Sequence, residues 1–195
     1  MDIIELDGSV KIYKTRIPFN KEELIKELYF NMDFNRFESA KDTAGRESQL
    51  IITSKNIEYV KSKAVNFITE NLLGNKTINY FQRNWVYVND KNASYVRWHV
   101  HSDNVSKVIQ NDWTYTFYVQ MPDNLKNNEG KISFKIDETE YNILPEEGDL
   151  LVFPASLLHK PELSPMSTKE RIVMAGNFVE LDVNKILEKR KTSLV

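Results

Sequence analysis

The chain has 195 residues, of which 41% are hydrophobic and 11% aromatic, a composition that predicts a soluble globular protein and argues against disorder. The length suits a single domain with a sizeable core, and the chain lacks the run of about 18 apolar residues that a membrane-spanning helix needs. A net charge of −2, with no concentrated basic stretch outside the 185–191 tail, argues against nucleic-acid binding.

The N-terminal residues 1–5 lack the basic and then apolar order of a signal peptide, and the chain contains no cysteine. Disulfide bonds and thiolate metal sites are therefore excluded. We expect a cytoplasmic protein on these grounds. Residues 1–75 could contribute a homodimer interface or a lid over a substrate, and the sequence leaves both open.

Two helices are predicted in the first part of the chain. Asn20 can cap the first, because Glu23 stands three residues later in a capping-box arrangement. Ser54 can cap the second, whose apolar residues recur every three or four positions over 57–72. A third, short helix is expected over 183–190, near the C-terminus.

Residues between about 78 and 178 predict strands instead, because short segments rich in β-branched and aromatic residues alternate with turn-forming ones. These segments are 78–81, 85–88, 95–101, 113–121, 131–136, 150–153 and 171–178. Many short strands in one continuous stretch are typical of a sandwich or jelly-roll barrel and not of alternating β-α-β units. Within the 113–121 segment, we expect the alternate aromatic residues Trp113, Tyr115 and Phe117 to pack against the helices.

The expected fold class is mostly β with supporting N-terminal helices (α+β), in a single domain over residues 1–195. Residues 1–77 would supply N-terminal strands and the supporting helices, and residues 78–180 the jelly-roll core. Residues 181–195 would form the short C-terminal helix and tail.

The three histidines of the chain and one nearby aspartate form a candidate metal site. Side chains two apart on a strand share a face, so His101 and Asp103 can converge on one point, and His159 follows an apolar strand. Two imidazoles and one carboxylate form the facial triad of non-haem iron(II) oxygenases, with open positions for a co-substrate and dioxygen. His99 lies on the same face as His101, so the set His99, His101 and His159 stays open as an alternative.

Arg171 stands 12 residues beyond His159 and opens an apolar strand. Its guanidinium is a planar fork that matches a carboxylate with two hydrogen bonds, and apolar neighbours would strengthen that pair. It is therefore suited to anchor the distal carboxylate of a dicarboxylic co-substrate. A surface ion pair with Glu170 or Asp149 is the alternative role.

This order of His-x-Asp, distal histidine and later arginine resembles the 2-oxoglutarate/iron(II) dioxygenase superfamily, particularly its prolyl-4-hydroxylase-like branch. Three segments between these residues also resemble family landmarks, in the right order: Tyr115–Gln120, Glu129–Phe134 and Gly148–Pro154. The resemblance covers roughly residues 80–180. It implies a double-stranded β-helix (jelly-roll) fold and an enzyme that uses Fe(II), 2-oxoglutarate and O2. The expected reaction is hydroxylation of a C–H bond, with release of succinate and CO2.

The resemblance also implies roles for individual residues. His101, Asp103 and His159 would be the iron ligands and catalytic residues, and Arg171 the partner of the distal carboxylate of 2-oxoglutarate. For the same co-substrate site it implies three further residues, namely Tyr118, Thr116 and Tyr87. The substrate would be a prolyl or other amino-acid side chain of a peptide, or a small molecule. Where many relatives carry a serine or threonine after the arginine, this chain has Val173 and Ala175.

A cupin-like barrel that binds a metal or ligand without oxygenase activity is the alternative. Gly148, Pro154 and His159 fit much of the second cupin motif, and the segment 99–101 mimics the first. However, valine and serine occupy positions 105–106, where the first motif requires a glutamate. A barrel that has lost catalysis and serves as an interaction module is a third alternative, and binding of 2-oxoglutarate would separate the oxygenase from both.

Overall fold

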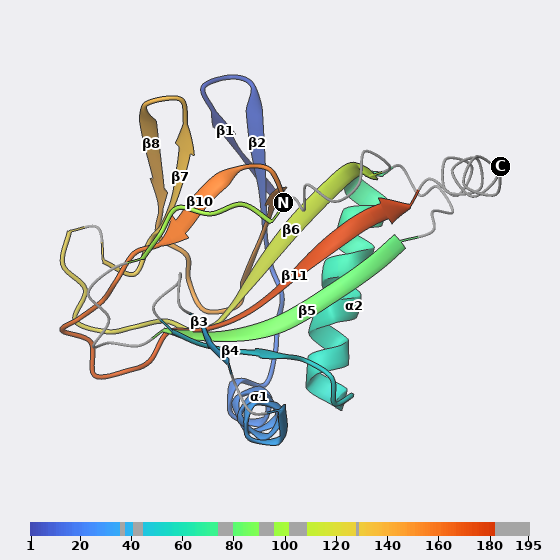
Figure 1. Ribbon diagram of the computed structural model, residues 1–195, viewed down its shortest axis with the longest axis vertical. Helices are drawn as coiled ribbons and strands as arrows, with labels where there is room; N and C mark the ends of the chain where they lie inside the picture. Colours follow the sequence, from blue (N-terminus) through green and yellow to red (C-terminus); the bar gives the residue numbers. More distant parts are fainter. Residues whose placement is uncertain are drawn as a thin grey trace, which may run out of the picture.

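The structure, a computed structural model, describes residues 1–35, 38–40, 45–73, 80–89, 96–101, 109–127 and 129–181 (Figure 1). Two helices lie within these ranges, α1 (Lys21–Asn35) and α2 (Lys55–Asn71). The strands of the first half are β1 (Asp2–Leu6), β2 (Val10–Arg16), β3 (Glu38–Ala40), β4 (Gly45–Gln49) and β5 (Tyr80–Asn89). Those of the second half are β6 (Ile109–Gln120), β7 (Ile132–Ile136), β8 (Thr139–Ile143), β9 (Asp149–Pro154), β10 (Leu158–Pro161) and β11 (Ile172–Leu181).

The strands form two antiparallel sheets. The larger has eight strands in the order β1-β2-β9-β6-β11-β5-β4-β3, and the smaller has three in the order β10-β7-β8. The sheets contact each other through an inner apolar cluster that contains Phe153 of β9 and Phe134 of β7, whose ring centroids are 5.0 Å apart. This is the mostly β, jelly-roll architecture expected from the sequence, and that prediction is confirmed.

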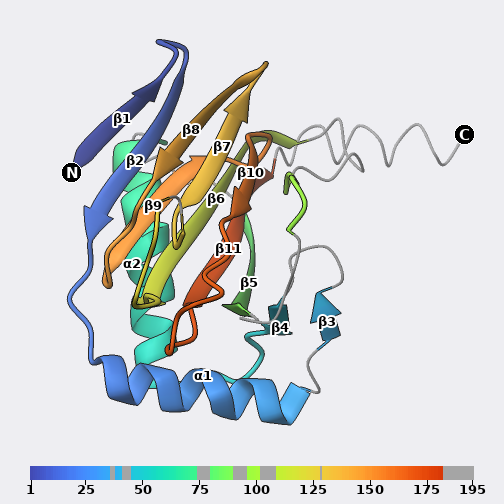
Figure 2. The same cartoon turned by 90° about the vertical axis from the view of Figure 1, so that its left-hand side faces the viewer.

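Both helices cover one face of the large sheet (Figure 2). Leu24 and Leu28 of α1 and Ile57, Val60 and Ile68 of α2 are almost completely buried in a single cluster with side chains of the central strands. The apolar residues of α2 recur at helical spacing, which explains why a helix forms there and which side it buries. The large sheet therefore has an outer face sealed by helices and an inner face turned to the small sheet.

Strand β6 shows how the sequence separates these two faces. Tyr115, Phe117 and Val119 are buried in the helix-facing cluster, and Trp113 packs against it. The predicted packing of this aromatic run against the helices is confirmed. Because side chains alternate along a strand, Thr116 and Tyr118 point to the inner face.

The two predicted helix caps behave differently. The side chain of Asn20 accepts a hydrogen bond from the Glu23 amide at 3.3 Å, as expected. Ser54 occupies the cap position of α2, but its hydroxyl donates to the carboxylate of Glu27 at 2.5 Å. That carboxylate accepts hydrogen bonds from the first amides of α2, including that of Ile57 at 3.1 Å. A side chain of α1 thus caps α2, which spacing along the sequence cannot reveal.

Some predicted boundaries are wrong. The segments 78–81 and 85–88, expected as separate strands, contribute to the single strand β5 over 80–89, because it pairs with β11 along nearly its whole length. The strand expected over 95–101 is reduced, within 96–101, to an isolated bridge between His99 and His159. The hairpin strand β8 was not predicted. The helix expected over 183–190 lies outside the described residues.

A tight turn leads into β9, the strand before the distal histidine. Gly148 has a φ of +89°, a conformation that side chains with a Cβ rarely adopt. Its amide donates to the carbonyl of Tyr118 at 2.8 Å, and its carbonyl accepts from the amide of Ile17 at 2.9 Å. Both the amide and the carbonyl of Gly148 are therefore hydrogen-bonded, and these bonds hold the turn before β9 next to the neighbouring segments.

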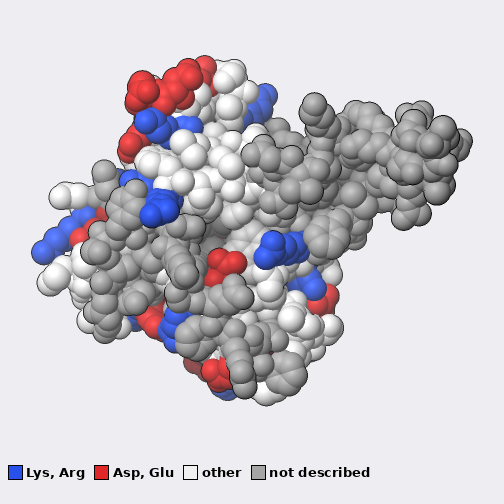
Figure 3. All heavy atoms as spheres, in the orientation of Figure 1, with Lys and Arg blue, Asp and Glu red and all other residues white. Residues whose placement is uncertain are grey.

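The surface seen from the side of Figure 1 carries charges of both signs (Figure 3). Acidic groups gather near the tips of the β1–β2 and β7–β8 hairpins, with lysines and arginines beside them. The described part of this face shows no continuous basic stripe. Neither of the two described helices is long and apolar enough to cross a membrane.

Candidate functional site

A cavity of about 350 Å³ opens on the inner face of the large sheet. It brings together nearly all the described residues that the sequence nominated, which are Tyr87, His99, His101, Thr116, Tyr118, His159 and Arg171. They come from β5, the 96–101 segment, β6, β10 and the residue before β11. Asp103 lies outside the described residues, so its predicted role stays a prediction.

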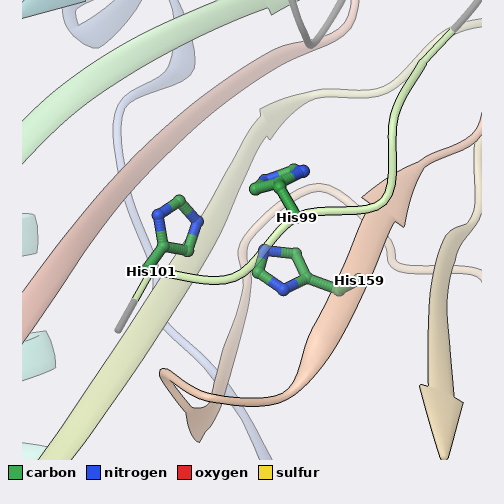
Figure 4. A group of neighbouring side chains, drawn as sticks. All are labelled: His99, His101 and His159. Atoms are coloured by element: carbon green, nitrogen blue, oxygen red, sulfur yellow. The ribbon is translucent and has the colours of Figure 1, made fainter. Parts of the chain in front are cut away.

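The histidines are placed by backbone pairing between two segments far apart in the sequence. The amides of His99 and His159 each donate to the other's carbonyl at 3.0 Å, which makes the two residues direct antiparallel partners. The His101 amide donates to the carbonyl of Ala155 at 2.8 Å. Figure 4 shows His99 and His101 extending from the 96–101 segment towards His159 on β10.

The three imidazoles form a compact cluster. Ring centroids lie 4.4 Å apart for His99 and His159, 5.0 Å for His101 and His159, and 5.1 Å for His99 and His101. Each ring offers a nitrogen within 4.8 Å of those offered by the others. This group could hold a metal ion after a small shift of the rings, because atoms that each lie about 2 Å from one ion are no more than about 4 Å apart.

Hydrogen bonds define which nitrogen of two rings carries the proton. Nδ1 of His159 lies 2.7 Å from the Leu157 carbonyl, and Nδ1 of His99 lies 3.2 Å from the Arg97 carbonyl. A carbonyl oxygen only accepts, so in each case Nδ1 is the donor. In a neutral ring, this leaves the lone pair on Nε2, the arrangement by which outer-shell carbonyls orient metal-binding histidines.

Burial keeps these imidazoles neutral. It lowers the pKa of His101 to about 3, with further lowering by the neighbouring His99 and Arg83. Burial likewise holds the pKa of His159 well below its usual value, and the other two histidines lower it further. Neutral imidazole is the form that binds a metal, so the rings of His101 and His159 are in their ligating state at neutral pH.

Arg171 is buried, with 3% of its surface exposed. Its Nη1 donates to the Lys131 carbonyl at 3.0 Å, and the guanidinium carbon lies 5.3 Å from the centre of the Tyr118 ring. Its Nε is buried and has no hydrogen-bond acceptor among the described residues. The site therefore holds a buried cation with an unused donor.

The surface ion pairs considered for Arg171 do not form. Asp149 pairs with Lys14 at 2.8 Å, and Glu170 pairs with Arg46 at 2.5 Å. The carboxylates that might have neutralised Arg171 are thus paired elsewhere. Leaving a buried guanidinium without an anion is costly, which indicates that an anionic ligand completes the site.

Two hydroxyl groups of β6 lie beside Arg171. The Thr116 hydroxyl donates to the Tyr118 hydroxyl at 3.3 Å, which confirms that the two side chains share a face. In the pairing of β6 with β11, Thr116 lies opposite Ala175 and Tyr118 opposite Val173. The two hydroxyls of β6 thus lie at positions of the sheet where β11 carries apolar side chains. Burial raises the pKa of Tyr118, so its phenol stays protonated and able to donate.

Strand β5 contributes an aromatic wall. Tyr87 lines the cavity and donates to the Asn89 side chain at 2.9 Å, and the ring centroids of Trp85 and His101 are 5.1 Å apart. Trp85 and Arg83 line the cavity but were not nominated from the sequence. They stand two and four residues before Tyr87, so strand alternation from Tyr87 could have found them. Glu47 of β4 also lines the cavity, and no sequence signal marks it.

No protein-family model and no curated protein sequence matches the chain. Solved structures, in contrast, do match the chain. A Pseudomonas putida prolyl-4-hydroxylase superposes with a TM-score of 0.65 at 12% identity, covering 88% of this chain and 94% of the other. The fold is that of the prolyl-4-hydroxylases.

Two further structures share the prolyl-4-hydroxylase fold. A viral collagen prolyl hydroxylase from Paramecium Bursaria Chlorella virus-1, solved with 2-oxoglutarate, gives a TM-score of 0.60 at 14% identity, covering 87% of this chain and 96% of the other. A prolyl hydroxylase from Trichoplax adhaerens, bound to a peptide fragment of a hypoxia inducible factor, gives a TM-score of 0.65 at 13% identity. The match covers 89% of this chain and 84% of the other. These similarities establish the architecture in which the cavity lies.

Proposed function

We propose that the chain is an Fe(II)- and 2-oxoglutarate-dependent oxygenase that hydroxylates a C–H bond of its substrate. The observation that carries this proposal is that one cavity holds both a cluster of neutral imidazoles and a buried arginine without an anionic partner among the described residues. A metal ion and a dicarboxylate need these two features at one site. The prolyl-4-hydroxylase fold supports the same assignment.

The donor set fits iron(II). Imidazole nitrogens suit this metal, and His101 and His159 are common to both ligand sets considered from the sequence. In the set first predicted, Asp103 would be the third ligand, and all three would be catalytic residues. Either set leaves coordination positions open for the co-substrate and dioxygen.

The other part of the cavity fits the distal carboxylate of 2-oxoglutarate. Arg171 would pair with it and bring its unsatisfied Nε donor close to an acceptor. The hydroxyls of Tyr118 and Thr116 would add hydrogen bonds from β6. Since these groups are almost completely buried, the pair would be desolvated and therefore stronger than one at the surface.

When bound, iron and 2-oxoglutarate supply the oxidising chemistry, with O2 consumed and succinate and CO2 released. The protein's own residues would bind the metal and the co-substrate and orient them. Carbonyls of the chain fix the imidazole rings of His99 and His159, and Arg171 fixes the direction of the co-substrate. Tyr87 and Trp85 form an aromatic wall on one side of the cavity.

A prolyl or other amino-acid side chain of a peptide is the substrate class that the fold favours, because one structural neighbour is a prolyl hydroxylase bound to a peptide fragment. A small-molecule substrate uses the same core arrangement and stays the alternative within the oxygenase proposal. Glu47 of β4 and Arg83 of β5 line the cavity as charged groups that either kind of substrate could contact.

A cupin-like metal-binding barrel without oxygenase activity is the second candidate, and the three-histidine cluster favours it as much as it favours the oxygenase. Arg171 has no role in that scheme, whereas burying it unpaired carries a cost. Binding of 2-oxoglutarate therefore separates the two candidates.

The test is an anaerobic titration of the purified protein with iron(II), with and without 2-oxoglutarate, following the visible charge-transfer band of the chelate. The wild-type protein should develop the band. His159→Ala should abolish it, and Arg171→Ala should require far more 2-oxoglutarate. Arg16→Ala is a matched control, because Arg16 forms an exposed ion pair with Glu146 away from the cavity. Iron binding without any response to 2-oxoglutarate would favour the cupin-like candidate.

A further inference from the structure

We propose that Arg83 and Asn177 form a subsite for a carboxylate of the substrate, at the end of the cavity that lies away from Arg171. The substrate is thereby one in which an acidic group stands close to the C–H bond that reacts. This inference names the substrate class of the proposed function and rests on it. Both residues line the cavity and lie within the described part of the chain.

Strand β11 and the residue before it run along the cavity and define its two ends. Every second residue of this segment lines the cavity, namely Arg171, Val173, Ala175 and Asn177. At about 3.3 Å per residue, the first and the last of these are roughly 20 Å apart. The arginine proposed to anchor 2-oxoglutarate therefore lies at one end of the row, and Asn177 lies at the other.

The candidate metal ligand His101 lies between these ends. Ala175 is the partner of Trp85 in the pairing of β11 with β5, and the ring centroid of Trp85 is 5.1 Å from that of His101. A co-substrate that reaches from Arg171 to a metal at His101 occupies the first part of the cavity. The part beyond the metal, where Asn177 lies, is thus left for the substrate.

Arg83 lies beside Asn177 at this second end. The two residues are direct partners in the pairing of β5 with β11, and opposite side chains on one face have Cβ atoms about 4.5–5.5 Å apart. Arg83 is exposed at the rim of the cavity, near enough to His101 for its charge to lower the pKa of that ring. One carboxylate can therefore contact both Arg83 and Asn177 while its neighbouring atoms lie close to the metal.

The charge of Arg83 is not neutralised within the described part of the chain. Arg16 and Arg46 each form an ion pair with a glutamate. Among the described residues, the hydrogen-bond partner of Arg83 is instead Gln49, whose side-chain oxygen accepts from Nε at 3.3 Å. A neutral amide orients the guanidinium but leaves its charge in place. Since a guanidinium is a planar fork of five donors, Arg83 keeps donors for an anionic substrate.

Asn177 is oriented to donate to the same carboxylate. The hydroxyl of Thr114, its partner on β6, donates to Oδ1 of Asn177 at 3.1 Å. Because the amide oxygen already accepts this bond, the amide NH2 is the group left to bind a ligand. The end of the cavity at Asn177 thus offers hydrogen-bond donors from two adjacent strands.

Glu47 belongs to a different part of the cavity. It is the register partner of Tyr87, which stands four residues along β5 from Arg83, a separation of about 13 Å. Tyr87 in turn lies opposite Val173, at the end of the cavity nearer Arg171. The acidic side chain is therefore on the co-substrate side, and the far end of the cavity suits an anion better than a cation.

The test is an NMR binding titration on the full chain loaded with Zn(II) and saturated with 2-oxoglutarate, so that Arg171 is already occupied. Two pairs of probes are compared, N-acetyl-L-proline with its amide and acetyl-Pro-Asp-amide with acetyl-Pro-Asn-amide. The first pair tests a terminal carboxylate, and the second tests an acidic side chain. We expect the acidic member of at least one pair to bind about 10-fold more tightly than its neutral partner, because charge-assisted hydrogen bonds are about twice as strong as neutral ones.

Variants assign this preference to the proposed subsite. Arg83→Gln should remove the preference for the acid and should still bind 2-oxoglutarate. Arg83→Lys keeps the charge without the fork and should restore part of the preference. Asn177→Ala should weaken binding of the acidic probe by a smaller factor, because it removes a neutral donor. Arg16→Gln, in an exposed ion pair away from the cavity, is the matched control and should behave as wild type.

The outcomes separate this inference from the proposed function. Equal or undetectable binding of both members in both pairs would overturn the inference and leave the oxygenase proposal intact. A preference that survives in Arg83→Gln would do the same. Weaker 2-oxoglutarate binding by Arg83→Gln would place Arg83 at the co-substrate and also overturn the inference. If the Zn(II)-loaded wild-type protein does not bind 2-oxoglutarate, the proposed function fails, and this inference fails with it.

Discussion

The two faces of the eight-stranded sheet differ in what they require of the sequence. The outer face meets α1 and α2 through apolar side chains such as Phe117, whose ring lies 5.0 Å from that of Phe19. The inner face carries Arg171 and the hydroxyls of β6 beside a cavity that His159 of the smaller sheet also lines. The same strands supply both faces, since successive side chains point to opposite sides.

The difference between the two faces separates residues that stabilise the fold from residues that are suited to bind a ligand. The outer face is packed mainly by apolar side chains, so its main contribution to stability is burial of apolar surface. The inner face buries an arginine that has no anionic partner among the described residues, and it faces two imidazoles, those of His101 and His159, whose pKa values burial lowers. Such groups cost stability and are retained where they bind a ligand. Substitutions on the outer face should therefore lower stability and leave ligand binding largely intact. Substitutions on the inner face should do the reverse.

The largest effect on stability should come from the outer face. Phe117→Ala removes a completely buried ring, and a change of this kind costs about 3–5 kcal/mol in the free energy of unfolding. Chemical denaturation measures it, and 2-oxoglutarate binding by the folded fraction should be unchanged. Tyr118→Phe, next to it on the inner face, is the control and should unfold close to the wild-type midpoint. Similar losses in both variants would refute the separation of the two faces.

Arg171→Met should show the opposite pattern. Losing one partner of a buried charged pair costs about 3 kcal/mol, so 2-oxoglutarate should bind about 100-fold more weakly. The ligand-free protein should unfold no more easily than wild type, because the variant removes a buried charge that has no anionic partner in the described part of the chain. Titration calorimetry with metal present measures the affinity for 2-oxoglutarate. Chemical denaturation without metal measures the free energy of unfolding. A variant that loses stability but keeps its affinity would assign Arg171 to the scaffold.

Acidification should destabilise the metal-free protein through the histidines. The pKa of His101 falls from 6.5 in the unfolded chain to about 3 in the folded one, so between these values only the unfolded state is protonated. Stability is therefore complete above pH 6.5 and falls as the pH drops towards 3, by at most about 1.4 kcal/mol per pH unit for this group.

His101→Gln isolates this contribution. Denaturation midpoints measured in chelator between pH 5 and 7 should depend less steeply on pH in the variant than in wild type. Burial and the neighbouring His99 and Arg83 are the causes of the lowered pKa, so the residual slope reports mainly on His159. Equal slopes in the two proteins would mean that His101 titrates with the same pKa in the folded and unfolded states.

The smallest effect is expected at the hydroxyl beside Arg171. Thr116→Val keeps the shape of the side chain but loses one hydrogen bond, worth about 0.5–1.5 kcal/mol, so 2-oxoglutarate affinity should fall roughly 3- to 10-fold. Thr116→Ser restores the hydroxyl and should recover most of the affinity. Equal binding by the Val and Ser variants would show that the hydroxyl does not reach the co-substrate.

Much of the architecture could be predicted because its signals are local. Alternation along β6 assigned Phe117 to the helices and Tyr118 to the interior, and helical spacing located both described helices. The same alternation placed Thr116 and Tyr118 on one face. The ends of the strands were less predictable. A break was expected within β5, but the strand is continuous because its partner β11 continues beside it.

The sequence by itself nominated the residues that we propose carry the chemistry, among them His101, His159 and Arg171, because residue type and spacing are local properties. Only the tertiary structure decided how they meet. It set His99 directly opposite His159 and left Arg171 without a carboxylate by pairing Asp149 with Lys14. Both results depend on which distant strands pair and in which register, and no local pattern in the chain specifies that choice.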